Sequence, residues 1–370
     1  HLIFIVKIKN NMTVCILGNG LSALTLAKSL VNQNIYVDVL FQKKDLEFSK
    51  TRTIGISKSN IEFFNKKIIN IEKLLWKLKN IEIFSNNLKE EKIINFENNN
   101  EHLFSIVKNN ELYQVLEKDL YKNKFFKKKL IKPNNLSFIK DYELIINCDH
   151  LNIITKKYFS KKIIKKYNSF AYTTIINHEK VLNNSARQIF TTKGPLAFLP
   201  ISNIETSVVY SVHNSKNKKN ENIEELIKAN NFIYKINKIE KISSFELKSL
   251  NLRSYYHNNI LAFGDLLHRI HPLAGQGFNM TIRDIRILVK IIKNRYDLGL
   301  PLDSSVNVKF EDSLKHKNFL FSNGVDLIYE FFNIERRIKS TIPGKSVQFI
   351  GKNPFINKLF TKIADEGILF

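Results

Sequence analysis

The chain has 370 residues, 44% of them hydrophobic, which is enough for a large core in one domain or two interleaved ones. Its net charge of +24 comes from lysines scattered among asparagine and isoleucine without a nucleic-acid-binding motif, so we predict no nucleic-acid partner and expect lysine runs such as 127–129 to be solvated. No apolar run approaches the roughly 18 residues of a spanning helix, and the two cysteines, Cys15 and Cys148, fall in apparent core strands, which indicates no disulfide framework and fits a reducing cytoplasm.

The first predicted elements surround a glycine-rich turn. Residues 13–17 form an apolar run typical of a buried strand, residues 21–30 carry apolar side chains at helical spacing, and residues 37–41 read as a second strand. The turn reads Gly-Asn-Gly-Leu-Ser-Ala from Gly18 to Ala23. A strand, a G-x-G-x-x-A turn and a helix in this order are the fingerprint of dinucleotide binding. Residues 1–11 are excluded from this reading, because a chain that starts with His1 suggests a natural start at Met12.

The middle of the chain reads mainly as sheet. Residues 170–176 and 206–212 are rich in β-branched and aromatic side chains, which favour strands. Between them, two prolines restrict the backbone of the apolar segment Gly194–Pro200. Residues 222–250 alternate charged and apolar side chains at helical spacing, and residues 300–370 are expected to be helical.

A second glycine-rich segment runs from Gly264 to Asn279. Residues 259–263 predict a short buried strand, and the apolar positions from Met280 onward recur at helical spacing, so a helix begins near Gly277. Glycines at a helix start let backbone N–H groups approach a ligand, and the helix dipole favours negative charge there. Asp265 follows the strand, at the edge where α/β folds place ligand contacts.

These segments resemble the class A FAD-dependent aromatic hydroxylases, and within them the ubiquinone-biosynthesis hydroxylases. Gly264-Asp265, His271-Pro272 and the Gly-Gln-Gly-Phe-Asn of residues 275–279 match the second flavin motif of that family, and Gly194–Pro200 matches a signature of its quinone-pathway members. The resemblance implies an α/β fold in which a Rossmann-like FAD-binding domain is interleaved with a β-sheet substrate domain and followed by C-terminal helices. On this pattern the FAD-binding parts are residues 12–75, 106–166 and 251–300, the substrate sheet is residues 76–105 and 167–250, and the C-terminal helices are residues 301–370.

The resemblance also implies the cofactor site. The residues expected to bind FAD come from both glycine-rich segments and from the turns after other strands: Gly18, Gly20, Ala23, Gln42, Arg52, Asp149, Gly264, Asp265, Pro272, Gly275, Gln276, Gly277, Phe278 and Asn279. Among these, Pro272, Gly277 and Asn279 are assigned to positioning at the reacting face of the flavin, and no acid or base is assigned.

The chain departs from the family pattern at three positions. Phe41 stands where an acid usually binds the adenosine ribose, and Gln42 follows it as a neutral hydrogen-bonding side chain. Asn110 stands where relatives carry an arginine beside the flavin, and His150 where they carry glycine. We interpret His150 as a surface loop residue without a catalytic role.

The activity implied by the resemblance is hydroxylation of the ring of a polyprenylated phenol in ubiquinone biosynthesis, with FAD, NAD(P)H and O₂. Gly194–Pro200 is expected to form a wall of the substrate site. His268 and His271 lack the partners of a zinc ligand set, so no metal is expected. The basic chain is expected to be cytoplasmic, to contact the inner face of an anionic membrane peripherally at about 1 kcal/mol per well-placed basic residue, and to meet other quinone-biosynthesis proteins.

Other functions stay open at this point. One is a different flavoenzyme, either an aromatic hydroxylase outside quinone synthesis or a prenyl-lipid oxidoreductase. Another is a degenerate, non-catalytic assembly subunit, which the departures at Phe41, Asn110 and His150 favour and the intact segment Gly264–Asn279 opposes.

Overall fold

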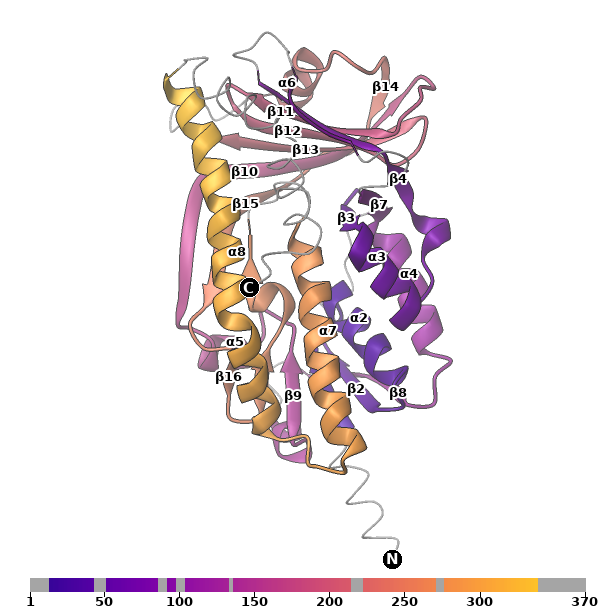
Figure 1. Ribbon diagram of the computed structural model, residues 1–370, viewed down its shortest axis with the longest axis vertical. Helices are drawn as coiled ribbons and strands as arrows, with labels where there is room; N and C mark the ends of the chain where they lie inside the picture. Colours follow the sequence, from indigo (N-terminus) through magenta and orange to yellow (C-terminus); the bar gives the residue numbers. More distant parts are fainter. Residues whose placement is uncertain are drawn as a thin grey trace, which may run out of the picture.

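The computed structural model describes residues 13–42, 51–85, 92–97, 104–132, 136–213, 222–270 and 276–338. It is a mixed α/β fold that ends in long helices, as the sequence predicts. Figure 1 shows a large sheet across one end of the molecule, with a second sheet and most of the helices at the other end. No helix of the described residues is long and apolar enough to cross a membrane.

A six-stranded sheet forms the centre of the helical part, in the order β16-β17-β9-β1-β2-β8. Its strands are β1 (Thr13–Leu17), β2 (Tyr36–Phe41), β8 (Phe126–Leu130), β9 (Leu144–Asn147), β16 (Tyr256–His257) and β17 (Ile260–Ala262). All neighbouring pairs except β16–β17 are parallel. Parallel strands are buried on both faces and therefore read as continuous apolar runs, which is why the sequence reveals β1 and β2.

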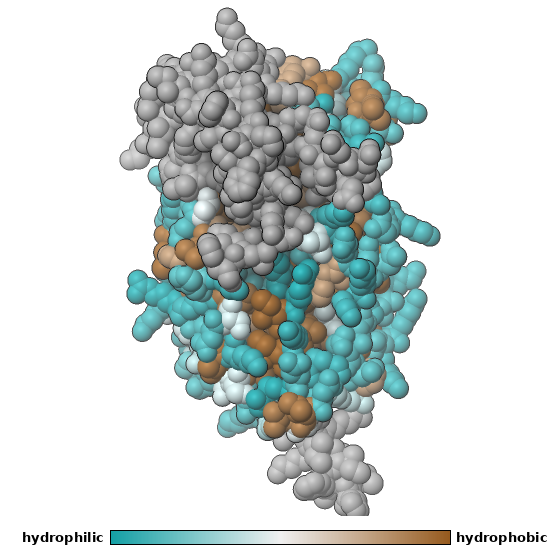
Figure 2. Space-filling view, in the orientation of Figure 1, coloured by the Kyte–Doolittle hydropathy of each residue, from teal (hydrophilic) through white to brown (hydrophobic). Residues whose placement is uncertain are grey.

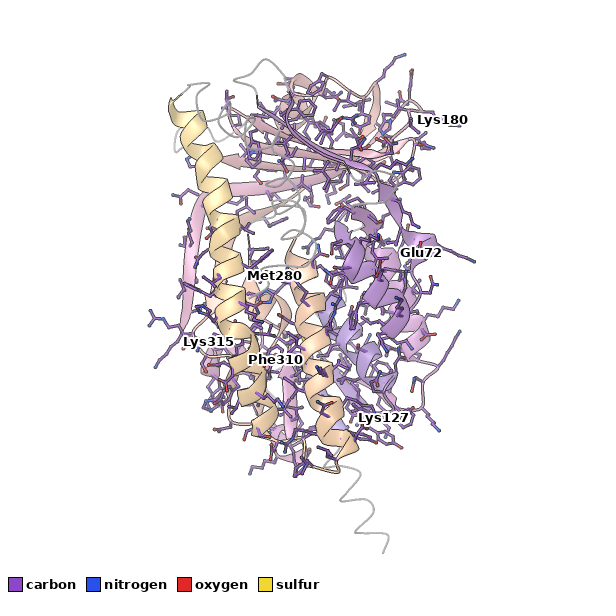
Figure 3. All side chains as sticks on the ribbon, viewed as in Figure 1. Glu72, Lys127, Lys180, Met280, Phe310 and Lys315 are labelled. Atoms are coloured by element: carbon purple, nitrogen blue, oxygen red, sulfur yellow. The ribbon has the colours of Figure 1, made fainter. Side chains whose placement is uncertain are left out.

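Seven α-helices are described, and those next to the six-stranded sheet bury it. They are α2 (Leu21–Val31), α3 (Lys58–Lys67), α4 (Asn109–Leu120), α5 (Ile153–Tyr158), α6 (Ile223–Ala229), α7 (Gln276–Asp297) and α8 (Ser304–Ile338). Short 3₁₀ turns occur at Glu72–Leu74, Ser137–Asp141 and Gly264–Leu266. Helices α7 and α8 run side by side in front of β9 (Figure 1). Phe310 of α8, labelled in Figure 3, is fully buried with its ring centroid 5.9 Å from that of Phe263.

The large sheet has nine strands in mainly antiparallel pairing. They are β5 (Asn80–Ser85), β6 (Lys92–Glu97), β10 (Lys162–His178), β11 (Ser185–Thr191), β12 (Gly194–Pro200), β13 (Glu205–His213), β14 (Ile236–Ile239), β15 (Ser243–Leu252) and β18 (His268–Arg269). The face of this sheet that packs against α6 has its own core, which includes Tyr210, Leu196, Ile189 and Ile227. The opposite face, here called the inner face, packs partly against the starts of β3 and α7.

A small antiparallel sheet joins the two parts of the molecule. It consists of β3 (Thr53–Ser57), β7 (Phe104–Lys108) and β4 (Trp76–Leu78). The Thr53 hydroxyl donates to the Ser207 hydroxyl of β13 over 2.8 Å, which ties this small sheet to the inner face of the large one.

The structure corrects two expectations from the sequence. Residues 222–250 are not continuously helical: α6 ends at Ala229, and β14 and β15 follow. The run 127–129 is not uniformly solvated, because side chains alternate along β8. The Lys128 side chain is only 2% exposed and pairs with Glu117, whereas Lys127 and Lys129 are exposed. Elsewhere Figure 2 shows a largely hydrophilic surface with isolated apolar residues.

Candidate functional site

The two glycine-rich turns meet at the start of α2. Gly18 has φ +111° and Gly264 has φ +64°, both in the region that favours glycine. A Cβ atom on Gly18 would lie 3.3 Å from the backbone nitrogen of Asp149, and one on Gly264 would lie 3.0 Å from Cβ of Ser22. The absence of side chains at both positions therefore lets the ends of β1, β9 and β17 pack closely around the α2 N-terminus.

Gly20, between them, faces open space. It is the N-cap of α2 with φ −80°, and a Cβ atom built there would meet no atom within 4 Å. No side chain caps this helix, and its first turn contains no acidic residue. Ala23 is a small, fully buried residue in the same turn. Free N–H groups and the positive helix end favour an anion, so this turn fits a pyrophosphate without a side chain in its way.

Two carboxylates flank this turn, at the carboxyl ends of β9 and β17. Asp149 is buried, and its side chain accepts the backbone N–H of Leu151 over 2.7 Å. Asp265 is exposed in the 3₁₀ turn. Burial, followed by the nearby carboxylates of Asp265 and Asp149, raises the pKa of the Cys148 thiol. Because Asp149 already holds its own turn, Asp265 is the carboxylate better placed to accept hydrogen bonds from ligand hydroxyls.

A shallow hollow opens beside this turn, where β2 ends. Its lining includes Gly18, Phe41, Gln42 and Asp149. Lys128 Nζ lies 4.8 Å from the centroid of the Phe41 ring. The position that carries an acid in the family pattern therefore holds an aromatic ring beside a buried cation, and Gln42 is the adjacent residue able to hydrogen-bond a ribose.

The glycine-rich turn has a support that sequence reasoning missed. The side chain of Asn19 is 1% exposed, and its oxygen accepts the Tyr113 hydroxyl over 2.9 Å. Lys128 Nζ in turn donates to the Tyr113 oxygen over 3.3 Å. The amphipathic pattern of residues 111–117 indicated α4 but gave no signal that Tyr113 would reach Asn19, because that contact joins residues 94 positions apart.

The start of α7 is fixed to β3 by one side chain. Asn279 is fully buried; its oxygen accepts the backbone N–H of Ser57 over 3.0 Å and the Asn60 amide over 3.1 Å, and its own amide donates to the Gly55 carbonyl over 3.1 Å. The Asn279 side chain is therefore engaged within the protein. A Cβ atom on Gly277 would meet no atom within 4 Å, so the backbone of this first helical turn is open.

The remaining expected residues lie in several places. Gln276 begins α7 and Phe278 is partly buried in its first turn. Arg52 is exposed, with its guanidinium carbon 5.9 Å from the centroid of the Phe245 ring of the large sheet. Pro272 and Gly275 lie outside the described residues.

The expected residues thus form two groups. Gly18, Gly20, Ala23, Gln42, Asp149, Gly264 and Asp265 share one edge of the six-stranded sheet. Arg52, Gln276, Gly277, Phe278 and Asn279 lie at or beside the starts of β3 and α7.

His268 is a structural partner of α7. Its Nε2 atom lies 2.5 Å from Oδ2 of Asp284, and both side chains are buried. Asn318 of α8 donates to the other oxygen of Asp284 over 3.2 Å. No group of three or more histidine, cysteine, aspartate or glutamate side chains suited to a metal ion occurs in the part of the chain that the structure describes.

Comparison with known sequences points to flavin enzymes. The model of a family described as FAD binding domain matches residues 139–297. The 3-demethoxyubiquinol 3-hydroxylase of Escherichia coli is 30% identical over 157 residues, covering 40% of this chain and 40% of the relative. The mitochondrial ubiquinone biosynthesis monooxygenase COQ6 of Caenorhabditis elegans is 26% identical over 214 residues, covering 46% of this chain and 48% of the relative. The aligned part thus spans less than half the length of these two relatives.

Solved structures share the whole fold. p-Nitrophenol 4-monooxygenase PnpA from Pseudomonas putida superposes with a TM-score of 0.78 at 11% identity, covering 96% of this chain and 100% of that one. Klebsiella pneumoniae HpxO, solved with FAD and uric acid, has a TM-score of 0.73 at 11% identity and covers 95% of this chain and 97% of its own. The α/β fold with C-terminal helices that the sequence predicts is therefore the fold of FAD-dependent monooxygenases.

Proposed function

We propose that this chain, which carries an FAD binding domain and is homologous to the ubiquinone-pathway hydroxylases, is an FAD-dependent monooxygenase that hydroxylates the ring of a polyprenylated phenol in ubiquinone biosynthesis. NAD(P)H and O₂ are its co-substrates. The observation that carries the proposal is the uncapped start of α2, where Gly20 leaves open space between two tightly packed glycine turns. Such a turn suits the pyrophosphate of a dinucleotide.

The chain's own residues would hold the cofactor as follows. Backbone N–H groups of the first turn of α2 would bind the pyrophosphate, with Gly18, Gly20 and Ala23 allowing its approach. Asp265 would accept hydrogen bonds from hydroxyls of the cofactor, and Gln42 would do so weakly at the adenosine end. The Asp149 turn and Gly264 would keep these groups in place.

The residues near the start of α7 would position the reacting ring. Backbone N–H groups at Gly277, Phe278 and Asn279 and the helix dipole would stabilise negative charge next to them, while the Asn279 side chain holds the helix against β3. Gln276, Arg52, Pro272 and Gly275 are assigned to the same end of the cofactor. Bound FAD would supply hydride acceptance from NAD(P)H and reaction with O₂, which no side chain here provides.

The substrate assignment rests on the relatives and on the large sheet. The quinone-pathway signature Gly194–Pro200 is strand β12, a central and almost fully buried strand. A protein with a net charge of +24 is also suited to peripheral contact with anionic lipid. We therefore assign a phenol or quinol substrate, a peripheral position at the inner face of the cytoplasmic membrane, and contact with other quinone-biosynthesis proteins.

The test is a product assay. Protein loaded with FAD is supplied with NADH or NADPH, O₂, and either 2-farnesylphenol or 4-hydroxybenzoate, and products are identified by mass spectrometry. Addition of one oxygen to the prenylphenol supports the proposal, whereas hydroxylation of the soluble acid alone overturns the substrate. In parallel, flotation with phosphatidylglycerol vesicles should decrease at high salt; no flotation at low salt removes the membrane contact.

One observation favours a second candidate, a non-catalytic assembly subunit. Phe41 beside Lys128 replaces the acid expected at the adenosine ribose. A protein that binds no FAD at saturating concentration, while co-purifying with quinone-biosynthesis enzymes, would favour this alternative over the monooxygenase.

A further inference from the structure

A row of small side chains crosses the inner face of the large sheet. Paired residues in neighbouring strands share a face. The register pairs Thr173 of β10 with Val209 of β13, Val209 with Ala197 of β12, and Ala197 with Gln188 of β11. These four side chains therefore form one continuous row, here called the inner row.

The inner row lies between two packed clusters and belongs to neither. On one side, Ala171 and Leu247 of the sheet pack with Ile270, Met280 and Phe321. On the other side, Ala186 packs with Leu78, Phe104 and Ile106, and Leu199 lies against them. Val209 and Gln188 are partly exposed although they sit on central strands of a nine-stranded sheet, so the protein's own side chains do not fully cover the row.

The inner row faces the start of α7. Ile270 and Met280 flank the flavin-motif segment on its two sides, and both pack in the cluster that contains Ala171, two residues before Thr173. Met280 is labelled in Figure 3 near the end of α7 that points toward the large sheet. The row therefore lies next to the segment assigned above to the reacting ring of the cofactor.

Thr173 has an unexplained hydroxyl. Its residue is 7% exposed, and its Oγ1 atom is buried without a hydrogen-bond partner. The neighbouring Thr174, on the opposite face, shows the usual arrangement, since its hydroxyl donates to the Glu240 carbonyl over 2.7 Å. A buried hydroxyl without a partner costs folding free energy, and a ligand that hydrogen-bonds it would account for its presence.

We propose that the inner row binds the aromatic ring of the substrate and that Thr173 hydrogen-bonds the ring hydroxyl. The inference rests on the proposed function. Val209 and Ala197 are small and apolar and leave space for a flat ring, while Thr173 supplies the buried polar group at one end of the row. Thr173 is thus a specificity-determining residue: it favours a phenol over the same molecule with a methylated oxygen, which cannot donate a hydrogen bond.

The experiment compares two ligands and four proteins. Binding of 2-farnesylphenol and of its methyl ether is measured by titration of flavin fluorescence in FAD-loaded protein without NAD(P)H, so no turnover occurs. Wild type should bind the phenol about tenfold more tightly than the ether, as one hydrogen bond allows. Thr173→Val should bind both equally, Thr173→Ser should restore the preference, and Thr174→Val on the opposite face should keep it.

Folding is measured on the same proteins. Thr173→Val removes a hydroxyl that makes no hydrogen bond in the protein, so its melting temperature should equal or exceed that of wild type, whereas Thr174→Val should melt lower. A lower melting temperature for Thr173→Val would indicate a structural role and count against the assignment.

The outcomes separate this inference from the proposed function. If wild type prefers the phenol and Thr173→Val keeps that preference, the Thr173 assignment is wrong and the monooxygenase proposal stands. If wild type binds both ligands equally, recognition of the hydroxyl is excluded. If FAD-loaded wild type binds neither ligand, the prenylphenol assignment fails, and this inference fails with it.

Discussion

The side-chain oxygen of Asn279 accepts the backbone N–H of Ser57 over 3.0 Å, and both residues are buried. This bond joins the first turn of α7 to the end of β3, 222 residues earlier in the chain. The turn assigned to the reacting end of the cofactor is therefore held by the opposite part of the FAD-binding region, which makes its geometry dependent on a single amide.

Replacement of that amide should be costly. Asn279→Leu preserves approximate size but leaves the Ser57 N–H and the Gly55 carbonyl without this partner, so the free energy of unfolding should fall by about 2–4 kcal/mol. Asn294→Leu, at an exposed position on the same helix, is the control and should change it by less than about 0.5 kcal/mol. Urea denaturation of both variants measures the difference; equal stabilities would show that the Asn279 contacts are unimportant.

The two glycines of the first turn should respond differently to alanine. Gly18→Ala forces a side chain into φ +111° against Asp149 and should destabilise the fold by about 1–3 kcal/mol. Gly20→Ala adds a methyl group that meets no protein atom, so stability should fall by at most about 1 kcal/mol, while FAD affinity falls about tenfold or more. Thermal melts and FAD titration separate the two effects. Unchanged FAD affinity in a folded Gly20→Ala protein would mean that the pyrophosphate lies elsewhere.

Asp265 should matter for binding and little for folding, because it is exposed. Asp265→Ala should weaken FAD binding by about 10- to 100-fold, since a charged hydrogen bond contributes about 1.5–3 kcal/mol. Glu246→Ala, at an exposed carboxylate on β15, is the control and should leave the dissociation constant unchanged. Equal affinity in Asp265→Ala and wild type would contradict the role assigned to this carboxylate.

Phe41 tests the missing ribose acid. Phe41→Glu should tighten FAD binding or leave it unchanged, because Phe41 lines the hollow at the end of β2 and the Lys128 ammonium is close by. Phe41→Gln, which has similar size and no charge, separates the effect of the carboxylate from loss of the ring. Calorimetric titration of FAD and melting temperatures with and without FAD are the measurements. A large drop in melting temperature without tighter binding would show instead that Phe41 is a packing residue.

Much of the fold could be predicted because its signals are local. Strand β1 has the predicted bounds Thr13–Leu17, and α7 begins at Gln276, one residue from the predicted Gly277. Both follow from short apolar runs and glycine-rich turns, which neighbouring residues determine. The segment 222–250 was wrong because alternating charged and apolar residues satisfy a short helix and a half-exposed strand such as β15 almost equally well.

The connections within the candidate site could not be predicted. The bonds of Asn279 to Ser57 and of Tyr113 to Asn19 join residues far apart in sequence, and no periodicity encodes such partners. Lys128 was hidden for a different reason. It lies in a lysine run whose neighbours are exposed, and only its pairing with Glu117 across the β8–α4 contact shows that it points inward.

The most direct test of the account is FAD binding by the purified chain. Protein is incubated with excess FAD, freed of unbound cofactor by gel filtration, and scanned in the visible range, with Gly20→Ala treated in parallel. We predict a flavin absorbance band that follows the wild-type protein in about equimolar amount, disappears from the protein on denaturation because the cofactor is noncovalent, and is reduced in the variant. A folded wild-type protein that carries no flavin band at saturating FAD would contradict the monooxygenase proposal.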